Sequence, residues 1–264
     1  MNTANLASLK DKHAVVTGGG TGIGLAIARE LADAGAKVTL MARNQERVQA
    51  QAAQLAEQSG VEAQGVQVDV SDEASVKSAF ATAVKQFGPI NILVNNAGVA
   101  ESAPFAKTSL ASWQKTMDVN ATGVFLCCQQ VISGMVEAGW GRIVTVASTA
   151  GLKGYRYVTA YVASKHAVIG LTRALALELA RKGVTVNAVC PGYTDTDIVA
   201  SSLQNIVAKT GQTEAQALQA LTADNPQARL VKPAEVATAV GWLCGAGSDA
   251  ITGQAISVSG GEVM

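Results

Sequence analysis

Short apolar runs alternate with longer segments of helical periodicity from one end of this chain to the other. The short runs are rich in Val, Ile and Leu and are apolar almost without a break, which is typical of strands covered on both faces. They predict seven buried strands, at residues 13–17, 37–41, 64–68, 91–95, 142–147, 185–190 and 255–258.

The longer segments have the spacing of helices that lie between these strands. They predict six helices, at residues 22–34, 45–58, 72–87, 110–137, 157–182 and 233–244. Four glycines, Gly35, Gly60, Gly88 and Gly183, stand just past predicted helix ends, where a left-handed residue is favoured. Pro233 stands at a first helical position, where proline is tolerated best.

Strand and helix alternate at the spacing of right-handed βαβ units. We therefore expect an α/β fold with a single-domain Rossmann-like doubly wound parallel sheet and helices on both faces. No linker, repeat or low-complexity segment divides residues 1–264. The stretch 193–232 is polar and mixed, and we expect it to form an irregular cover over a ligand near the carboxyl ends of the strands.

Composition excludes several classes of function. Twenty basic residues balance twenty acidic ones with no dense basic run, so nucleic-acid binding is not expected. No uninterrupted apolar stretch reaches the ~18 residues of a spanning helix, and residues 1–12 lack a signal-peptide pattern, so we expect a cytoplasmic protein without a membrane partner. The four cysteines lack CxxC spacing and are interpreted as reduced core thiols, and with only two histidines no metal site is predicted.

A glycine-rich loop follows the first predicted strand and leads directly into a helix. Residues 17–24 read Thr-Gly-Gly-Gly-Thr-Gly-Ile-Gly. Glycines allow the backbone to approach a ligand closely, and the helix amino terminus presents free N–H groups and a favourable dipole to a pyrophosphate. The spacing T-G-x-x-x-G-I-G differs from the usual G-x-G-x-x-G, but its position between strand and helix predicts a dinucleotide site.

The end of the second strand indicates which dinucleotide binds. NAD-binding units carry an acidic residue there that accepts hydrogen bonds from the ribose. This chain has Ala42 and Arg43 instead, and a guanidinium suits a 2′-phosphate. NADP(H) is therefore favoured, while NAD(H) stays possible because Arg43 would also fit as a solvated residue at the start of the next helix. A second basic residue in place of Thr21 would have strengthened the preference.

Tyr161 and Lys165 stand four residues apart, so they share one face of the helix predicted at 157–182. A nearby ammonium is expected to lower the pKa of the phenol, which makes it a usable proton donor. Ser148 follows the fifth strand and can hydrogen-bond a substrate oxygen, and Asn120 could hold an ordered water for proton supply. Open α/β sheets bind ligands at the carboxyl ends of their strands, and Ser148 follows such an end, so we predict that these four residues are catalytic.

Together these motifs make the chain resemble the short-chain dehydrogenase/reductase family, in its single-domain branch. The likeness extends from Lys10 to the end of the chain and is carried by residues 17–24, 69–70, 95–98, 120, 148, 161–165, 191–192 and 252–254. It implies that Tyr161 is the general acid/base, that Lys165 tunes it and binds the nicotinamide ribose, that Ser148 orients the carbonyl and that Asn120 completes a proton relay. With the loop and Arg43, it implies a nucleotide site formed by Gly18, Gly20, Thr21, Gly22, Ile23, Arg43, Asp69, Val70, Asn96, Ala97, Gly98, Tyr161, Lys165, Pro191, Gly192, Thr194 and Thr196.

Within that family, the runs 143–151, 163–170, 186–192 and 225–230 are similar to ketoreductases that act on acyl-carrier-protein or CoA thioesters. We therefore expect reversible reduction of a 3-oxoacyl thioester or a similar bulky ketone, with pocket walls from residues 99–105, 152–157 and 193–232. An NAD-dependent 3-hydroxyacyl-CoA or other secondary-alcohol dehydrogenase is the alternative. A non-catalytic nucleotide-sensing module is the alternative from a different class. A serine hydrolase is disfavoured, because no G-x-S-x-G elbow is present.

The family resemblance implies a homo-oligomer, most often a tetramer. Two predicted helices support this, because 157–182 has few charges before Arg173 and 110–136 has only Lys115 and Asp118. A helix that is apolar around most of its circumference needs cover on the side away from the sheet.

Overall fold

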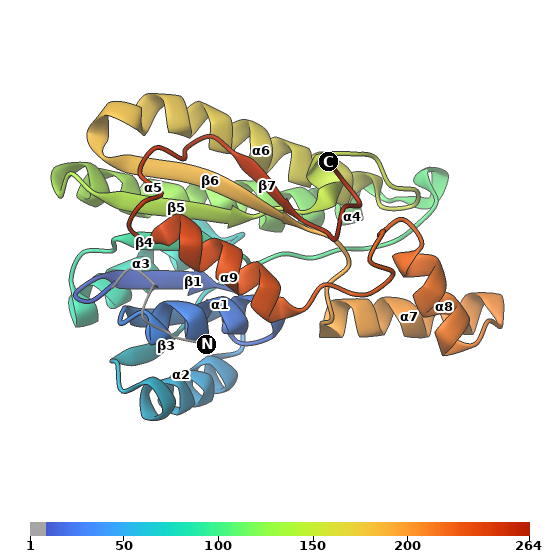
Figure 1. Ribbon diagram of the computed structural model, residues 1–264, viewed down its shortest axis with the longest axis horizontal. Helices are drawn as coiled ribbons and strands as arrows, with labels where there is room; N and C mark the ends of the chain where they lie inside the picture. The colour runs from blue at the N-terminus through green and yellow to red at the C-terminus, as the bar shows by residue number, and fades with distance from the viewer. Residues whose placement is uncertain (1–8) are drawn as a thin grey trace.

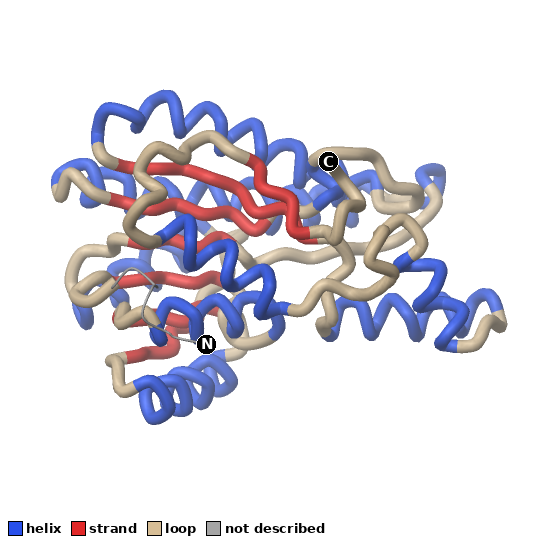
Figure 2. Tube along the Cα trace, in the orientation of Figure 1, coloured by secondary structure: helices blue, strands red, loops and turns tan. Residues whose placement is uncertain are grey.

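The computed structural model describes residues 9–264, apart from the side chains at positions 198, 201, 202, 205, 206 and 209. All seven predicted strands are present, and they form one sheet in the order β3-β2-β1-β4-β5-β6-β7 with every neighbouring pair parallel. Their bounds are β1 His13–Thr17, β2 Lys37–Ala42, β3 Ala63–Gln67, β4 Ile92–Asn95, β5 Gly141–Val146, β6 Val184–Pro191 and β7 Ala255–Val258. The expected Rossmann-like doubly wound sheet is confirmed (Figure 2).

The helices cover both faces of the sheet (Figure 1). They are α1 Gly22–Asp33, α2 Gln45–Ser59, α3 Glu73–Phe87, α4 Leu110–Met117, α5 Gly123–Glu137, α6 Thr159–Leu179, α7 Asp197–Thr210, α8 Glu214–Thr222 and α9 Pro233–Cys244. One apolar core includes side chains from α3, α5 and α6, and a second includes side chains from α1, α2 and α9. The inner strands β1, β2, β4, β5 and β6 are buried between these two cores, which explains their apolar sequences, whereas the edge strands β3 and β7 are only partly buried.

The strand order reverses between β1 and β4. The chain runs outward from β1 to β3 on one side of this point and from β4 to β7 on the other. The connections that leave β1 and β4 therefore diverge and leave a crevice at the carboxyl ends of these strands, where open α/β sheets bind their ligands. Both the glycine-rich loop and the Asn96–Ala97–Gly98 segment leave the sheet at this crevice.

The helix predicted at 110–137 is present as a continuous helical run. It contains a π-helical turn, η2 Asp118–Thr122, between α4 and α5, which the sequence did not predict. Wide turns of this kind are frequent at functional sites, and Asn120 lies within this one. The helix predicted at 157–182 begins at Thr159, because Tyr157 has a left-handed φ of 69° that an α-helix does not accept.

The stretch 193–232 was expected to be irregular, and the structure corrects this by placing α7 and α8 within it. Thr213 and Gln216 form a reciprocal capping box at the start of α8, and Gly211 ends α7 with a φ of 71°. The mixed polarity of this stretch did not predict α7 and α8, because these helices pack mainly on each other rather than on the sheet. In Figure 1 they project away from the rest of the fold.

The continuous run Leu110–Glu137 is the one helical segment, among the described residues, that is long and apolar enough to cross a membrane, with a mean hydropathy of 1.3. This test uses length and composition alone, and the core helix of a globular protein also passes it. Here the buried side of the run packs in the core formed with α3 and α6. The four cysteines are free and buried, as the sequence indicated.

Candidate active site

The glycine-rich loop between β1 and α1 leaves no room for side chains. Gly18 and Gly22 have φ values of 65° and 53°, which L side chains rarely adopt. A Cβ at Gly24 would lie 2.3 Å from the carbonyl oxygen of Gly18. The loop backbone and the amino terminus of α1 are therefore open to a ligand such as a pyrophosphate.

Two side chains tie this loop to the end of β4. The amide of Asn96 donates hydrogen bonds to the carbonyl oxygens of Thr17 (3.0 Å) and Gly18 (3.2 Å). The Thr17 hydroxyl in turn accepts from the backbone N–H groups of Asn96 (3.0 Å) and Ala97 (3.1 Å). Asn96 thus holds the loop in shape, and Thr17, the first residue of the loop motif, shares this task.

The segment after β6 closes the other side of the loop. A methyl group at Gly22 would lie 3.2 Å from Cγ2 of Thr196, the residue that precedes α7. Thr194 is buried, and its hydroxyl donates to the carbonyl oxygen of Gly192 at 2.9 Å. The structure therefore brings the residues predicted after β6 against those predicted after β1.

A cavity of about 420 Å³ lies at the carboxyl ends of β2 and β3. Its walls are formed by Arg43, Gln67, Val68, Asp69, Ser75 and Ser78. Gln67 donates to the backbone oxygen of Arg43 at 3.0 Å. Hydrogen bonds from Ser71 lower the pKa of Asp69, and the charge of Arg43 lowers it further. Arg43 thus faces the same cavity as the ionised carboxylate of Asp69, two residues beyond the end of β3.

Two further residues lie near this cavity. The side chain of Val70 is buried in the core and packs against Gly123, so it does not line the cavity. Arg47, in the first turn of α2, lies beside the glycine-rich loop, since a methyl group at Gly20 would be 3.5 Å from its Cδ. Arg47 therefore offers the basic group near the loop that Thr21 does not supply.

Ser148, Tyr161 and Lys165 come together between β5 and α6. Ser148 caps a 3₁₀ turn, η3 Thr149–Gly151, by accepting from the N–H of Ala150 at 3.1 Å. A hydrogen bond between the Ser148 side chain and Tyr161 lowers the pKa of the phenol, but burial has the larger effect and raises that pKa overall. The predicted lowering of the Tyr161 pKa by Lys165 is not found.

Lys165 is buried, and its ammonium donates to the backbone oxygen of Val146 at 2.9 Å. Its Nζ lies 5.5 Å from the centre of the Tyr161 ring. Burial lowers the pKa of Lys165 to about 8. The hydrogen bond to a carbonyl at the end of β5 thus fixes the ammonium over the face of the phenol ring.

Asn120 is fully engaged by protein groups. Its side chain accepts from the N–H of Val99 at 2.8 Å and donates to the backbone oxygen of Val99 at 2.9 Å. It also donates to the hydroxyl of Ser164, which lies next to Lys165 on α6. The amide thus anchors the segment after β4, and a methyl group at Gly98 would be 3.4 Å from its Oδ1 and 3.8 Å from Nζ of Lys165.

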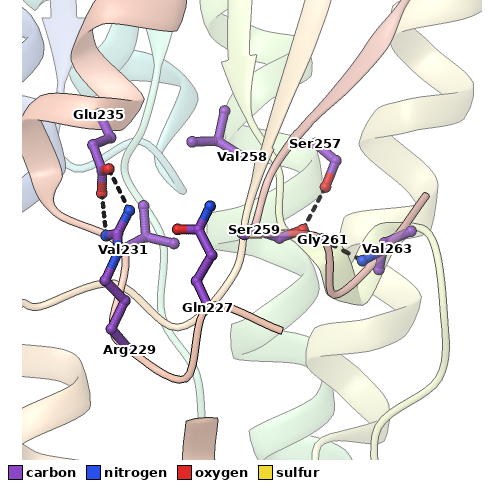
Figure 3. Close-up of a pocket in the computed structure, with 10 residues that line it drawn as sticks. Gln227, Arg229, Val231, Glu235, Ser257, Val258, Ser259, Gly261 and Val263 are labelled. Atoms are coloured by element: carbon purple, nitrogen blue, oxygen red, sulfur yellow. Dashed lines mark hydrogen bonds and ion pairs between the residues drawn. The ribbon is translucent and has the colours of Figure 1, made fainter. Parts of the chain in front are cut away.

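A separate cavity of about 240 Å³ lies beside the end of β7 and the start of α9 (Figure 3). An ion pair between Arg229 and Glu235 stands on one side of it, and the C-terminal residues Ser259–Val263 stand on the other. Neither Ser148 nor Tyr161 lines this cavity. Among residues 9–264, no group of three or more His, Cys, Asp or Glu side chains is placed to hold a metal ion.

Comparison with known proteins supplies the family. The model of the short chain dehydrogenase family matches residues 12–207. The chain belongs to the short-chain dehydrogenase family. As a member of this family it is an NAD(P)-dependent oxidoreductase that acts on carbonyl or alcohol groups.

Similar proteins include enzymes named for the reduction of ketoacyl groups. A solved structure of a tryptophan variant of actinorhodin polyketide ketoreductase with NADPH is 42% identical, with a TM-score of 0.91 over 95% of this chain and 97% of the other. A 3-oxoacyl-[acyl-carrier-protein] reductase of Aquifex aeolicus is 38% identical over 96% of this chain and 98% of its own length. A cis-4-hydroxycyclohexanecarboxylate dehydrogenase of Sinomonas cyclohexanicum is 37% identical over 95% and 96% of the two chains.

Proposed function

We propose that this protein is an NADPH-dependent ketoreductase that converts a 3-oxoacyl thioester, or a similar bulky ketone, into the secondary alcohol. The observation that carries the proposal is the convergence of Ser148, Tyr161 and Lys165 at the edge of the sheet that also holds the glycine-rich loop. The substrate class is supported by similarity to the Aquifex aeolicus reductase and to the actinorhodin ketoreductase.

The residues of the crevice fit a dinucleotide phosphate. The loop at residues 18–24 packs so closely that a Cβ at Gly24 would clash with Gly18, which leaves its backbone open to a phosphate. Arg43 supplies a guanidinium to the cavity at the end of β2, where an NAD-binding unit would carry an acidic residue. We assign the pyrophosphate to this loop and the 2′-phosphate to Arg43 and Arg47. Thr194, Thr196 and Lys165 would hold the nicotinamide half. When bound, NADPH supplies the hydride.

Side chains of the protein orient the substrate carbonyl and supply the proton that its oxygen accepts. The Ser148 hydroxyl donates a hydrogen bond to the carbonyl oxygen of the substrate, which fixes the carbonyl beside Tyr161. The phenol of Tyr161 then gives its proton to the same oxygen as negative charge develops there. Burial keeps this phenol neutral at pH 7, which is the form that a proton donor in reduction requires. Lys165, whose ammonium donates to the carbonyl oxygen of Val146, would hold the nicotinamide half of the dinucleotide beside this phenol.

The direct test follows NADPH oxidation by absorbance with acetoacetyl-CoA and with unactivated ketones of similar size. We expect a kcat/KM for the thioester well above that for the simple ketone, and a preference for NADPH over NADH. Equal kcat/KM values would reduce the assignment to a broad carbonyl reductase. A preference for NAD and for the alcohol would favour a secondary-alcohol dehydrogenase, and binding without turnover would favour a nucleotide sensor.

We also propose that the protein is a cytoplasmic homo-oligomer, a tetramer by resemblance to its family. Exposed apolar side chains support the assembly, since Phe125 on α5 is 46% exposed and Leu177 on α6 is 84% exposed. Such side chains on neighbouring helices are typical of surfaces that a second copy covers.

A further inference from the structure

The C-terminal tail carries a buried carboxylate that the reaction described above does not use. The side chain of Glu262 is only 2% exposed. One of its oxygens accepts a hydrogen bond from the phenol of Tyr155 and lies 3.2 Å from Nζ of Lys153. The same ammonium lies 3.4 Å from the carboxylate of Asp224, just beyond α8. Three distant segments of the chain therefore meet at Glu262 and Lys153.

Glycines make this burial possible. Gly260 and Gly261 have φ values of 64° and 94°, so the chain turns sharply after β7. A methyl group at Gly260 would lie 2.3 Å from Oδ1 of Asn225, and one at Gly192 would lie 2.9 Å from Oε2 of Glu262. The tail is thus seated between the end of β6 and the turn after α8.

The hydrogen bonds of Tyr155 have a definite direction. Its hydroxyl is 2.7 Å from that of Thr149 and also bonds to Glu262. The phenol has one proton and a carboxylate only accepts, so Tyr155 donates to Glu262 and Thr149 donates to Tyr155. Thr149 directly follows Ser148, so the chain of contacts from the tail ends beside the hydroxyl assigned to the carbonyl.

Tyr155 also contacts the segment that leads into α7 and α8. Its ring packs edge-on against Tyr193, with centroids 6.4 Å apart. Through Tyr155, Glu262 is therefore linked both to Thr149, next to Ser148, and to Tyr193, at the start of the segment that leads into α7.

We propose that Glu262 is a positioning residue that holds the segment 193–226 and the 148–155 loop together around the substrate, and thereby sets the affinity for the ketone. This proposal rests on the ketoreductase function. Its carboxylate accepts the hydrogen bond of Tyr155 and forms an ion pair with Lys153. A second ion pair of Lys153, with Asp224, holds the turn after α8. No atom of Glu262 needs to touch the substrate, because it acts through Tyr155 and Lys153.

The first test removes the charge of the Glu262 side chain while keeping its shape. In Glu262→Gln we expect KM for acetoacetyl-CoA to rise about tenfold, which corresponds to the loss of one charge-assisted hydrogen bond. We expect kcat and KM for NADPH to stay within about twofold of the unmodified enzyme, since neither the proton donor nor the nucleotide site is altered. Glu57→Gln on the exposed side of α2 is the matched control and should change nothing. An unchanged KM for the ketone, or an equal rise in KM for NADPH, overturns the proposal.

Tyr155→Phe provides a second variant that removes a single hydroxyl and keeps the ring. It should raise KM for the ketone by a similar factor, and the double variant with Glu262→Gln should be no worse than the more affected single variant. Additive effects would show that Glu262 does not act through Tyr155, and would overturn this route.

Amide hydrogen exchange gives a readout that needs no turnover. In Glu262→Gln, the backbone N–H groups of residues 225–231 should exchange faster than in the unmodified protein, whereas those of β5 should not change. Exchange that is unchanged at residues 225–231 overturns the proposal. If the unmodified protein reduces no ketone, the proposed function fails, while the exchange result still decides whether Glu262 holds these segments.

Discussion

At the scale of single residues, burial acts on Tyr161 and Lys165 in opposite directions. It raises the pKa of the phenol and lowers that of the ammonium to about 8, because removal of water disfavours the charged form of each group. Tyr161 and Lys165 lie one helical turn apart on α6, so the helix itself sets their spacing. Their pKa values depend instead on burial by the elements packed around them.

Replacing Tyr161 by phenylalanine keeps the ring and removes the proton. We expect kcat with a ketone substrate to fall by about 10²- to 10⁴-fold, the usual contribution of a positioned acid. NADPH binding, measured by fluorescence titration, should stay close to that of the unmodified enzyme. A loss below about tenfold would contradict the assignment of Tyr161 as the proton donor.

Arg43 is expected to select the phosphorylated dinucleotide. Arg43→Ala should raise KM for NADPH about tenfold or more and leave KM for NADH nearly unchanged, because only NADPH carries a phosphate at that position. Arg29→Ala on the exposed side of α1 is the matched control. Equal changes in KM for NADPH and NADH would show that Arg43 is a solvated residue and would favour NAD as the cofactor.

The lowered pKa of Lys165 predicts how nucleotide binding depends on pH. The ammonium attracts the anionic nucleotide below pH 8 and becomes a neutral amine above it, so affinity is lost as pH rises through about 8. We expect the Kd for NADPH to increase by about tenfold between about pH 7 and about pH 9.5, the loss of one charged contact. Lys165→Met should bind more weakly at every pH, with no step near 8. The same step in Lys165→Met would assign the titration to another group.

At the scale of elements, α7 and α8 differ from the rest of the molecule. Val199, Leu203 and Ala217 form a small apolar cluster of their own, separate from the two cores that flank the sheet. An element with so little shared core opens at a lower free energy than the sheet does. This suits a cover over the substrate, since substrate must enter and product must leave.

Exchange of backbone amides should reveal this difference. We expect the amides of α7 and α8 to exchange faster than those of β5 and β6, and to slow when NADPH and a ketone analogue are both present. Leu203→Ala should speed exchange in α7 and α8 alone, because the side chain belongs only to their cluster. Uniform acceleration across the sheet would show that the cover is part of the main cooperative unit.

At the scale of the whole molecule, apolar surface remains on the helices outside the sheet. Leu177 on α6 and Phe125 on α5 are exposed, and the run Leu110–Glu137 has few charges. Neither of these two side chains belongs to the buried cores, and under the proposed assembly we expect further copies of the chain to cover them.

The mass in solution tests this assembly. Light scattering at micromolar concentration should give a multiple of the 26.9 kDa chain, a tetramer by family resemblance. Leu177→Lys should shift the distribution to smaller species, because it places a charge in the apolar contact. Val84→Lys, at an exposed apolar position on α3, is the control and should not shift it. A monomer for the unmodified protein would contradict the proposal.

The sequence alone determined the features that depend on near neighbours along the chain. Short, mainly apolar runs predict the seven strands, and glycines such as Gly60 and Gly183 predict helix ends, because backbone φ and side-chain period are local properties. The glycine-rich loop and the four-residue spacing of Tyr161 and Lys165 were also visible, since each lies within one short segment.

Tertiary structure decided what depends on residues far apart. The Tyr161 pKa moves upward rather than downward because burial by surrounding elements outweighs the hydrogen bond with Ser148. Asn120 is bonded to Val99, and Glu262 is buried beneath Gly192, because chain folding brings together groups whose positions no local period reports. The α7–α8 pair was missed for the same reason, since its apolar positions face each other and not the sheet.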